Sequence, residues 1–316
     1  MRASSSPLCF LLTQTIVPYY FYGMKKTFLF FALFLLVSCN QKQIKTSEAE
    51  LALPLSFPVI DAHTHFHSKE LNNYKQPSPQ ILAEFKDAGV SGAVVHFSAS
   101  ENFGAEVNRK SKHQWITCMG LHPGDSVKKV EKGITEGRFQ CLKVYLGYVP
   151  KWANDPFYLP FYKLAERKKI PVVFHTGDTY DKKGKVKYAD PLQIDEIAVD
   201  YPKVKFVIAH VGNPWFNSAA EVVYKNDNVY VDVSGLLLGD VSEVKPEELE
   251  ELVIKPLRWV YAYVENPKKF LFGSDWPLVK IRPYIELMKR TIPEKDWKGF
   301  FSDNAREVFG FKPESN

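Results

Sequence analysis

Short apolar runs alternate with longer amphipathic segments from Phe57 to the end of the chain. Eight runs are rich in Val, Ile and Phe and continuous enough to be strands buried on both faces. The segments between them place apolar residues three or four positions apart, which predicts helices at Ser78–Ala88, Tyr158–Lys169 and Gln193–Tyr201. The eight predicted strands are Pro58–Asp61, Gly92–Phe97, Trp115–Leu121, Gln140–Leu146, Pro171–His175, Val204–His210, Asn228–Val233 and Lys269–Gly273.

This alternation predicts one α/β domain over residues 57–316, a single (β/α)₈ TIM barrel, because eight such units fill about 250 residues in that fold. An open, doubly wound sheet is the rival architecture, and it would carry a glycine-rich phosphate loop after its first strand. Here the first strand is followed by histidines instead. We therefore expect a barrel, in which catalytic residues lie at the C-terminal ends of the strands.

The N-terminus has the layout of an export signal. Met24 begins a short basic region, the apolar run Phe28–Val37 follows, and Ser38 and Cys39 come next. The run is too short to span a bilayer, and the segment ending at Cys39 resembles a bacterial lipobox. We interpret residues 1–38 as a leader and lipoprotein signal peptide with Met24 as the true start, and 39–56 as a polar tether. These features predict an exported protein, held on a membrane of the bacterial cell envelope through lipidated Cys39.

Composition excludes several classes of protein. Hydrophobic residues make up 45% of the chain and charged residues 24%, as in ordinary globular proteins. The formal charge is +5, and three of the cations (Arg2, Lys25 and Lys26) belong to the leader, so no nucleic-acid partner is expected. Cys118 and Cys141 lie in apolar runs without a C-x-x-C pair, so we expect buried free thiols, although an exported protein can form disulfides.

Several predicted strands end in residues that bind metal ions. His63 and His65 are two positions apart at the end of the first strand and therefore point the same way, into the mouth of the barrel. His175 and Asp275 end two other strands and complete a nitrogen and oxygen donor set. Such a set suits Zn²⁺, with Mn²⁺, Fe²⁺ or Co²⁺ as alternatives. His210 ends a further predicted strand.

These motifs resemble the amidohydrolase superfamily. The likeness covers residues 58–310 and is strongest to the amidohydrolase-related branch (family 2), which includes aminocarboxymuconate-semialdehyde decarboxylase and several lactonases. It implies that His63, His65, His175 and Asp275 hold one metal ion and that His210 contacts the water or the substrate. The matching segments are Ile60-Asp61-Ala62-His63-Thr64-His65, Ile170–Gly177, Phe206–Gly212, Phe272–Pro277 and Asp303–Arg306.

A bound divalent cation lowers the pKa of its water from about 16 toward about 7, which supplies a nucleophile at neutral pH. Asp275 could accept the proton of that water, and His210 could orient the nucleophile or polarise the substrate carbonyl. His96 and His113 we interpret as hydrogen-bonded structural residues.

Three further residues are candidate substrate contacts. On the predicted strand Gln140–Leu146, Leu142 and Val144 should face the helices, which turns Lys143 and Tyr145 into the barrel. Lys143 could bind a substrate carboxylate. In other branches of the superfamily a lysine on this strand is carbamylated and bridges two metals, whereas the other motifs here resemble the branch with one metal. His122 and Trp276 are the other two candidates.

The leading functional hypothesis is a metal-dependent hydrolase of a small-molecule amide, ester or lactone. A non-oxidative decarboxylase of an unsaturated or aromatic carboxylic acid could use the same site. A third hypothesis is a surface-anchored binding protein that has lost catalysis. The sequence leaves the oligomeric state open.

Overall fold

The computed structural model describes residues 55–65, 79–97 and 114–312. These lie in a compact unit comprising residues 46–316, and the predicted leader lies outside them. Eight strands form one sheet in chain order, and every neighbouring pair is parallel. The strands are β1 (Val59–Thr64), β2 (Val90–Phe97), β3 (Gln114–Leu121), β4 (Cys141–Tyr145), β5 (Val172–His175), β6 (Phe206–Ile208), β7 (Val229–Asp232) and β8 (Phe270–Leu271).

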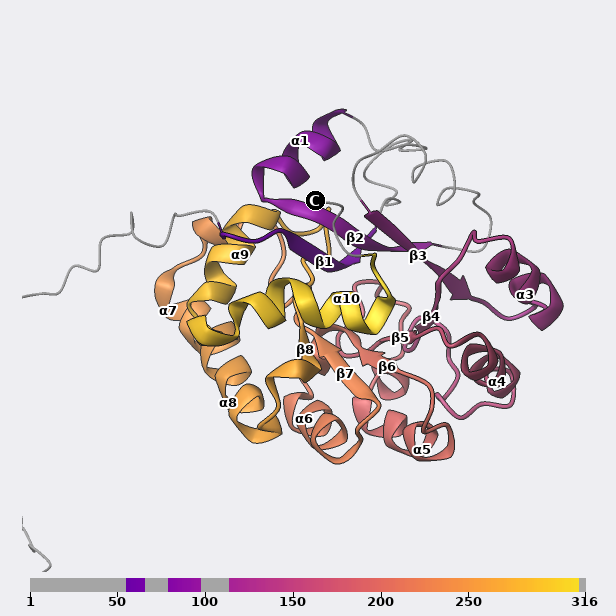
Figure 1. Cartoon of the computed structure of the whole chain (residues 1–316). Coiled ribbons are helices and arrows are strands. Elements are labelled where there is room, and N and C mark those ends of the chain that lie inside the picture. The colour runs from indigo at the N-terminus through magenta and orange to yellow at the C-terminus, as the bar shows by residue number, and fades with distance from the viewer. Residues whose placement is uncertain (1–54, 66–78, 98–113, 313–316) are drawn as a thin grey trace, which may run out of the picture. The chain divides into compact units, whose positions relative to one another are not determined.

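The sheet curls until its first and last strands meet. The amide of Ala62 donates to the carbonyl of Phe272 over 2.8 Å, and Thr64 forms a parallel bridge with Trp276. Helices surround the resulting barrel, as Figure 1 shows. The TIM-barrel prediction is confirmed. The α-helices are α1 (Pro79–Asp87), α3 (Val127–Thr135), α4 (Leu159–Lys168), α5 (Ile194–Asp200), α6 (Phe216–Lys225), α7 (Pro246–Leu249), α8 (Lys255–Val264), α9 (Ile281–Lys289) and α10 (Asn304–Phe309).

The two faces of the strands belong to separate apolar cores. Leu142 and Val144 of β4 join the outer core, between the sheet and the helices. Cys141, on the opposite face, joins the inner core, which also contains Val308 and Phe309 of α10. Figure 1 shows α10 lying across the barrel. Lys143 is buried with the parity of Cys141, so the predicted orientation of β4 is confirmed.

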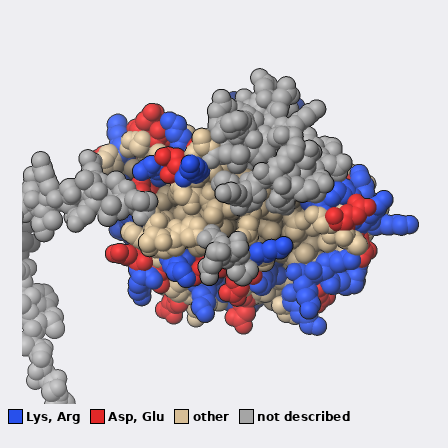
Figure 2. All heavy atoms as spheres, turned by 45° about the horizontal axis from the view of Figure 1, so that its top comes forward, with Lys and Arg blue, Asp and Glu red and all other residues tan. Residues whose placement is uncertain are grey.

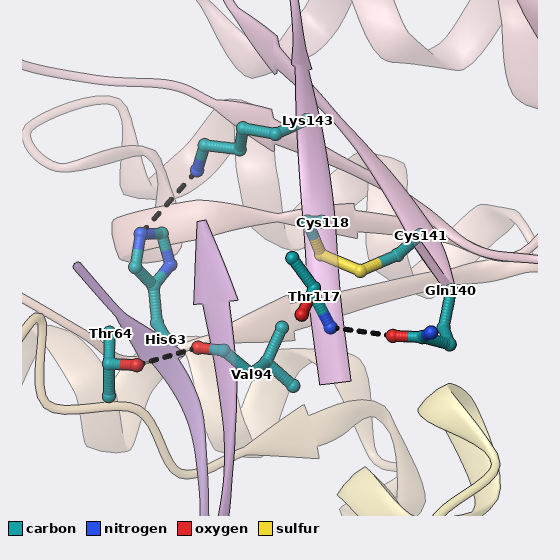
Figure 3. Close-up of a disulfide and its surroundings, with 8 residues drawn as sticks. All are labelled: His63, Thr64, Val94, Thr117, Cys118, Gln140, Cys141 and Lys143. Atoms are coloured by element: carbon teal, nitrogen blue, oxygen red, sulfur yellow. Dashed lines mark hydrogen bonds between the residues drawn. A yellow bond between two sulfur atoms is a disulfide. The ribbon is translucent and has the colours of Figure 1, made fainter. Parts of the chain in front are cut away.

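Cys118 and Cys141 form a disulfide between β3 and β4 (Figure 3). The expectation of free thiols was wrong. The two residues are register partners on adjacent strands, with Cα atoms 4.3 Å apart, and both side chains face the barrel interior. This pairing across 23 positions depends on strand register, which the apolar pattern alone does not determine.

The helix bounds follow the sequence closely, whereas several strand bounds do not. β1 ends at Thr64 rather than at the predicted Asp61, and β8 ends at Leu271 rather than at Gly273. The helices α1, α4 and α5 each lie within one residue of the predicted bounds. The predicted strand Val204–His210 is shorter, because β6 ends at Ile208 and a short 3₁₀ segment, Ala209–Gly212, follows. His210 and Val211 there have positive φ angles of 61° and 50°, which turn the chain out of the sheet.

Within the described residues, no helix is long and apolar enough to cross a bilayer. On the face shown in Figure 2, basic and acidic side chains are interspersed rather than gathered by sign.

Candidate metal centre

Three side chains converge at the mouth of the barrel. The Nε2 atoms of His63 and His65 lie 3.3 Å apart. The Oδ1 atom of Asp275 lies 3.3 Å from His65 Nε2 and 3.6 Å from His63 Nε2. Asp275 follows β8 and takes a positive φ of 68°, and its amide donates to the carbonyl of His63. Closure of the barrel thus brings together the end of β1 and the segment after β8, which are more than 200 residues apart in the sequence.

The donor atoms of this triad fit a divalent cation. Asp275 Oδ1 is buried and has no hydrogen-bond partner among the described residues, a costly state for a carboxylate oxygen unless a cation binds there. Burial by itself raises the pKa of Asp275, but the imidazoles of His65, His210 and His63 outweigh it and hold the pKa well below its ordinary value. Burial lowers the pKa of His63, and the charge of Lys143 lowers it further. A charged carboxylate beside a neutral imidazole is the protonation state that metal binding requires.

His63 is oriented from behind by a residue to which the sequence analysis gave no role. Asp232, the last residue of β7, accepts from His63 Nδ1 over 2.9 Å, and both side chains are fully buried. Because a carboxylate only accepts, Nδ1 carries the proton and Nε2 keeps its lone pair for the centre. Asp232 ends a strand, as the predicted ligands do, so the same rule could have found it.

Asp61 supports the other side of the centre. Its carboxyl group accepts from the His63 amide over 3.1 Å and from the Ser274 hydroxyl over 2.6 Å. Burial raises the pKa of Asp61 to about 7, although these hydrogen bonds act to lower it. Asp61 therefore ties β1 to the segment that carries Asp275.

His175, the fourth predicted ligand, faces His210 instead of the triad. Its Nδ1 lies 3.2 Å from His210 Nε2, while its Nε2 donates to the carbonyl of Asp178 over 2.9 Å. Among the described residues, two sets of potential ligands have donor atoms within 4.8 Å of one another, and His175 belongs to neither. The sets are His63 with His65 and Asp275, and His63 with His210 and Asp232.

Lys143 reaches the centre from β4. Its side chain is fully buried, and Nζ lies 3.5 Å from His63 Nε2, as Figure 3 shows. Burial lowers the pKa of Lys143 to about 8, although the carboxylates of Asp232 and Asp275 act to raise it. No carboxylate forms an ion pair with Lys143 among the residues that the structure describes.

His96 departs from its predicted role as a hydrogen-bonded structural residue. It is buried on β2 with its ring centroid 4.2 Å from that of His63, and neither ring nitrogen has a hydrogen-bond partner within the described part of the chain. Burial lowers its pKa well below the ordinary value. His96 thus packs as a neutral ring against His63. His113 lies outside the described residues.

A cavity of about 260 Å³ opens beside the centre. Its lining includes His175, His210 and Asp275 together with tyrosines and leucines, among them Tyr148 and Leu238. None of the three candidate substrate contacts is among the residues lining this cavity. Lys143 is fully buried, His122 stacks on Tyr145 with ring centroids 5.7 Å apart, and Trp276 is buried and donates to Glu84.

Gly235 allows the centre to close. It has a φ of +59°, and a Cβ atom at this position would lie 2.8 Å from Asp275 Oδ2 and 3.2 Å from His210 Nδ1. Only glycine combines this backbone conformation with so close an approach.

Comparison with known proteins identifies the family of the chain. A family model described as amidohydrolase matches residues 60–311. The chain belongs to the amidohydrolase family. A curated relative, the uncharacterized metal-dependent hydrolase YjjV of Escherichia coli K12, is 26% identical over 138 residues. That match covers 39% of this chain and about half of the relative, 52%. The family match thus assigns this chain to the amidohydrolases, and the metal dependence in the name of YjjV is a property of that relative.

Solved structures share the barrel of this amidohydrolase. An uncharacterized TIM-barrel protein of Bordetella bronchiseptica has a TM-score of 0.62 at 16% identity, covering 80% of this chain and 99% of its own. A probable 2-pyrone-4,6-dicarboxylic acid hydrolase of Acinetobacter baumannii has a TM-score of 0.59 at 15% identity, covering 81% and 100%. The 5-carboxyvanillate decarboxylase of Sphingomonas paucimobilis has a TM-score of 0.58 at 14% identity, with the same coverage. At these identities the likeness establishes the fold.

Proposed function

We propose that this amidohydrolase hydrolyses a small-molecule amide, ester or lactone with water activated by one divalent metal ion, most favourably Zn²⁺. The observation that carries the proposal is the convergence of His63 Nε2, His65 Nε2 and Asp275 Oδ1, three donor atoms within 3.6 Å of one another. We also retain His175 as a ligand, reached by a rotation of its ring toward the triad. A Zn²⁺ ion bound there would supply a Lewis acid and a water of pKa near 7.

Two side chains would handle the proton and the nucleophile. Asp275 presents a charged oxygen to the centre and is placed to accept a proton from water. His210 lines the cavity, and its Nδ1 donates to the carbonyl of Ser234 over 3.0 Å. Its Nε2 therefore carries a lone pair and accepts a hydrogen bond. This tautomer favours orienting a water molecule over polarising a carbonyl, which needs a donor.

The test is an Asp275→Asn variant assayed with a panel of amides, esters and lactones. The substitution keeps the shape but removes the charge of the ligand and proton acceptor. We expect at least a 100-fold loss of turnover, because the transition state loses a principal electrostatic contact. Metal analysis of parent and variant shows whether the ion is lost with the rate. A parental rate in the variant would reject the proposal.

Decarboxylation of an unsaturated or aromatic carboxylic acid remains the second candidate, and one observation favours it. Lys143 places a buried cationic group 3.5 Å from His63 Nε2, without an ion-pair partner among the described residues, where it could attract a carboxylate. Measuring CO₂ release against acid release over one panel separates the two reactions. A catalytically inactive binding protein would show neither product and would be isolated without metal.

We further propose that the chain is exported and held on the membrane through lipidated Cys39. The buried Cys118–Cys141 disulfide supports this location, because such bonds persist in oxidising compartments. Expression of the full chain with labelled palmitate, beside a Cys39→Ser variant, tests it. Label in the parent and not in the variant is expected, and an unlabelled parent in the soluble fraction would reject the anchor.

A further inference from the structure

The end of β7 connects two histidines of the centre through one carboxylate. We propose that Asp232 and Ser234 form a positioning pair that sets the protonated nitrogen in both His63 and His210, so that each ring turns an Nε2 lone pair to the centre. The inference rests on the proposed function, since it concerns how the chain prepares a metal-binding and water-orienting site. It assigns a role to two residues outside the predicted ligand set.

The first half of the pairing concerns His63. Asp232 Oδ2 lies 2.9 Å from His63 Nδ1, and both side chains are fully buried, so no solvent competes for the contact. A carboxylate opposite Nδ1 stabilises the tautomer with its proton there. The ligand nitrogen, Nε2, is left deprotonated without any change in the net charge of the ring.

The second half concerns His210. Asp232 Oδ1 accepts from the Ser234 hydroxyl over 2.5 Å, so that hydroxyl gives its proton away and turns a lone pair to His210 Nδ1, 2.9 Å distant. The Ser234 carbonyl oxygen lies 3.0 Å from the same nitrogen. Both oxygens accept, so Nδ1 must donate and Nε2 is left with a lone pair.

Asp232 also holds the backbone that carries His210. Its Oδ1 accepts from the His210 amide over 3.2 Å. His210 has a φ of 61°, a left-handed conformation that is unfavourable for a residue with a side chain unless its surroundings stabilise it. The Asp232 carboxylate therefore positions the ring proton of His63 directly. It also holds the backbone of His210 directly and the ring of His210 through Ser234.

The chain contains its own control for this arrangement. Asp240 and Ser242 have the same spacing and the same local contacts, with the Ser242 amide and hydroxyl donating to Asp240 over 3.0 and 2.5 Å. That turn is at the surface and its carboxylate pairs with Lys280. The two sites thus share the local Asp-x-Ser turn and differ in what else the carboxylate and the hydroxyl contact. Only at Asp232 and Ser234, of these two turns, do they contact histidines.

The decisive variant is Asp232→Asn, with Asp240→Asn as its matched control. The amide in Asp232→Asn can donate to His63 Nδ1, which moves the ring proton to Nε2 and blocks the ligand atom. We expect 10- to 100-fold weaker Zn²⁺ binding, measured by competition with a chelator, against unchanged binding in Asp240→Asn. In ¹⁵N-histidine NMR spectra, the Nδ1–H signal of His63 should be lost in Asp232→Asn and kept in the control. Parental affinity with that signal retained would overturn the inference.

Ser234→Ala tests the His210 half and remains informative if Asp232→Asn fails to fold. It leaves the contact between His63 and Asp232 intact, so Zn²⁺ affinity and KM should stay near parental values while kcat falls about tenfold. Ser242→Ala is the control and should match the parent. A parental kcat in Ser234→Ala would overturn this half. A parent without Zn²⁺ or turnover would instead reject the proposed function, and the NMR signal of His63 would still decide the positioning role.

Discussion

His175 Nδ1 and His210 Nε2 face each other over 3.2 Å, and in the neutral rings both atoms carry lone pairs. The other nitrogen of each ring donates to a backbone carbonyl, that of Asp178 for His175 and that of Ser234 for His210. Burial lowers the pKa of both rings, which disfavours a proton between them. The one proposed metal ion would relieve this opposition of two lone pairs, so its binding should depend on His210 as well as on the ligands.

Zn²⁺ should therefore stabilise the parent more than a His210→Ala variant. Each tenfold loss of affinity removes about 1.4 kcal/mol of ligand-induced stabilisation, or about 3 °C in Tm for a domain of this size. Calorimetric unfolding with and without Zn²⁺ measures the difference. His122→Ala, which alters a histidine outside the pair, is the control. Equal Zn²⁺-induced shifts in the parent and His210→Ala would contradict this account.

Gly235→Ala should damage the centre, whereas Gly239→Ala should not. Both glycines have positive φ angles, so each alanine costs about 1–2 kcal/mol of stability. A Cβ atom at Gly235 would meet Asp275 Oδ2 at 2.8 Å, whereas nothing lies within 4 Å of one at Gly239. Urea unfolding should show similar losses of stability, while Zn²⁺ affinity and turnover fall only in Gly235→Ala. Parental turnover in Gly235→Ala would show that the centre tolerates the added methyl group.

The disulfide should contribute measurably to the stability of the barrel. It closes a loop of 23 positions, for which the loss of chain entropy in the unfolded state corresponds to about 3 kcal/mol. A Cys118→Ala, Cys141→Ala double variant should therefore unfold at a lower urea concentration than the parent. Its free energy of unfolding should be smaller than that of the parent by about the same 3 kcal/mol. Adding reductant during unfolding should lower the stability of the parent and leave the double variant unchanged. If reductant also lowered the stability of the double variant, the loss of stability in the parent would not come from this disulfide.

Lys143 should make the stability of the metal-free protein depend on pH. Its pKa is about 8 in the folded protein, against 10.5 for a lysine in water, so the unfolded chain binds a proton that the folded chain lacks between these values. The penalty for burying the ammonium is complete below pH 8 and disappears as the pH rises toward 10.5. Stability should therefore rise over this window by on the order of 3 kcal/mol.

A Lys143→Met variant should lose this rise and be more stable than the parent at pH 7. Urea unfolding of metal-free protein at about pH 7 and about pH 10 measures both effects. Lys129→Met, at an exposed position, is the control for general alkaline effects. An equal pH response in the parent and Lys143→Met would show that the buried amine is not the source.

The one-dimensional pattern determined the architecture of the barrel and much of the candidate centre. Val- and Ile-rich runs buried on both faces require covering helices, and α1, α4 and α5 lie within a residue of their predicted bounds. In a parallel barrel all strands end at one rim, so His63, His65 and Asp275 could be placed together from strand ends alone. The parity of β4 likewise placed Lys143 inside.

Only the tertiary structure decided what depends on register and on the orientation of individual rings. The Cys118–Cys141 bond required the register of β3 against β4, and the role of Asp232 required knowing which nitrogen of His63 it faces. His175 turned toward His210 because the backbone carbonyl of Asp178 binds its other nitrogen. Sequence spacing specifies which face a side chain joins, whereas hydrogen bonds from distant segments specify how its ring is turned.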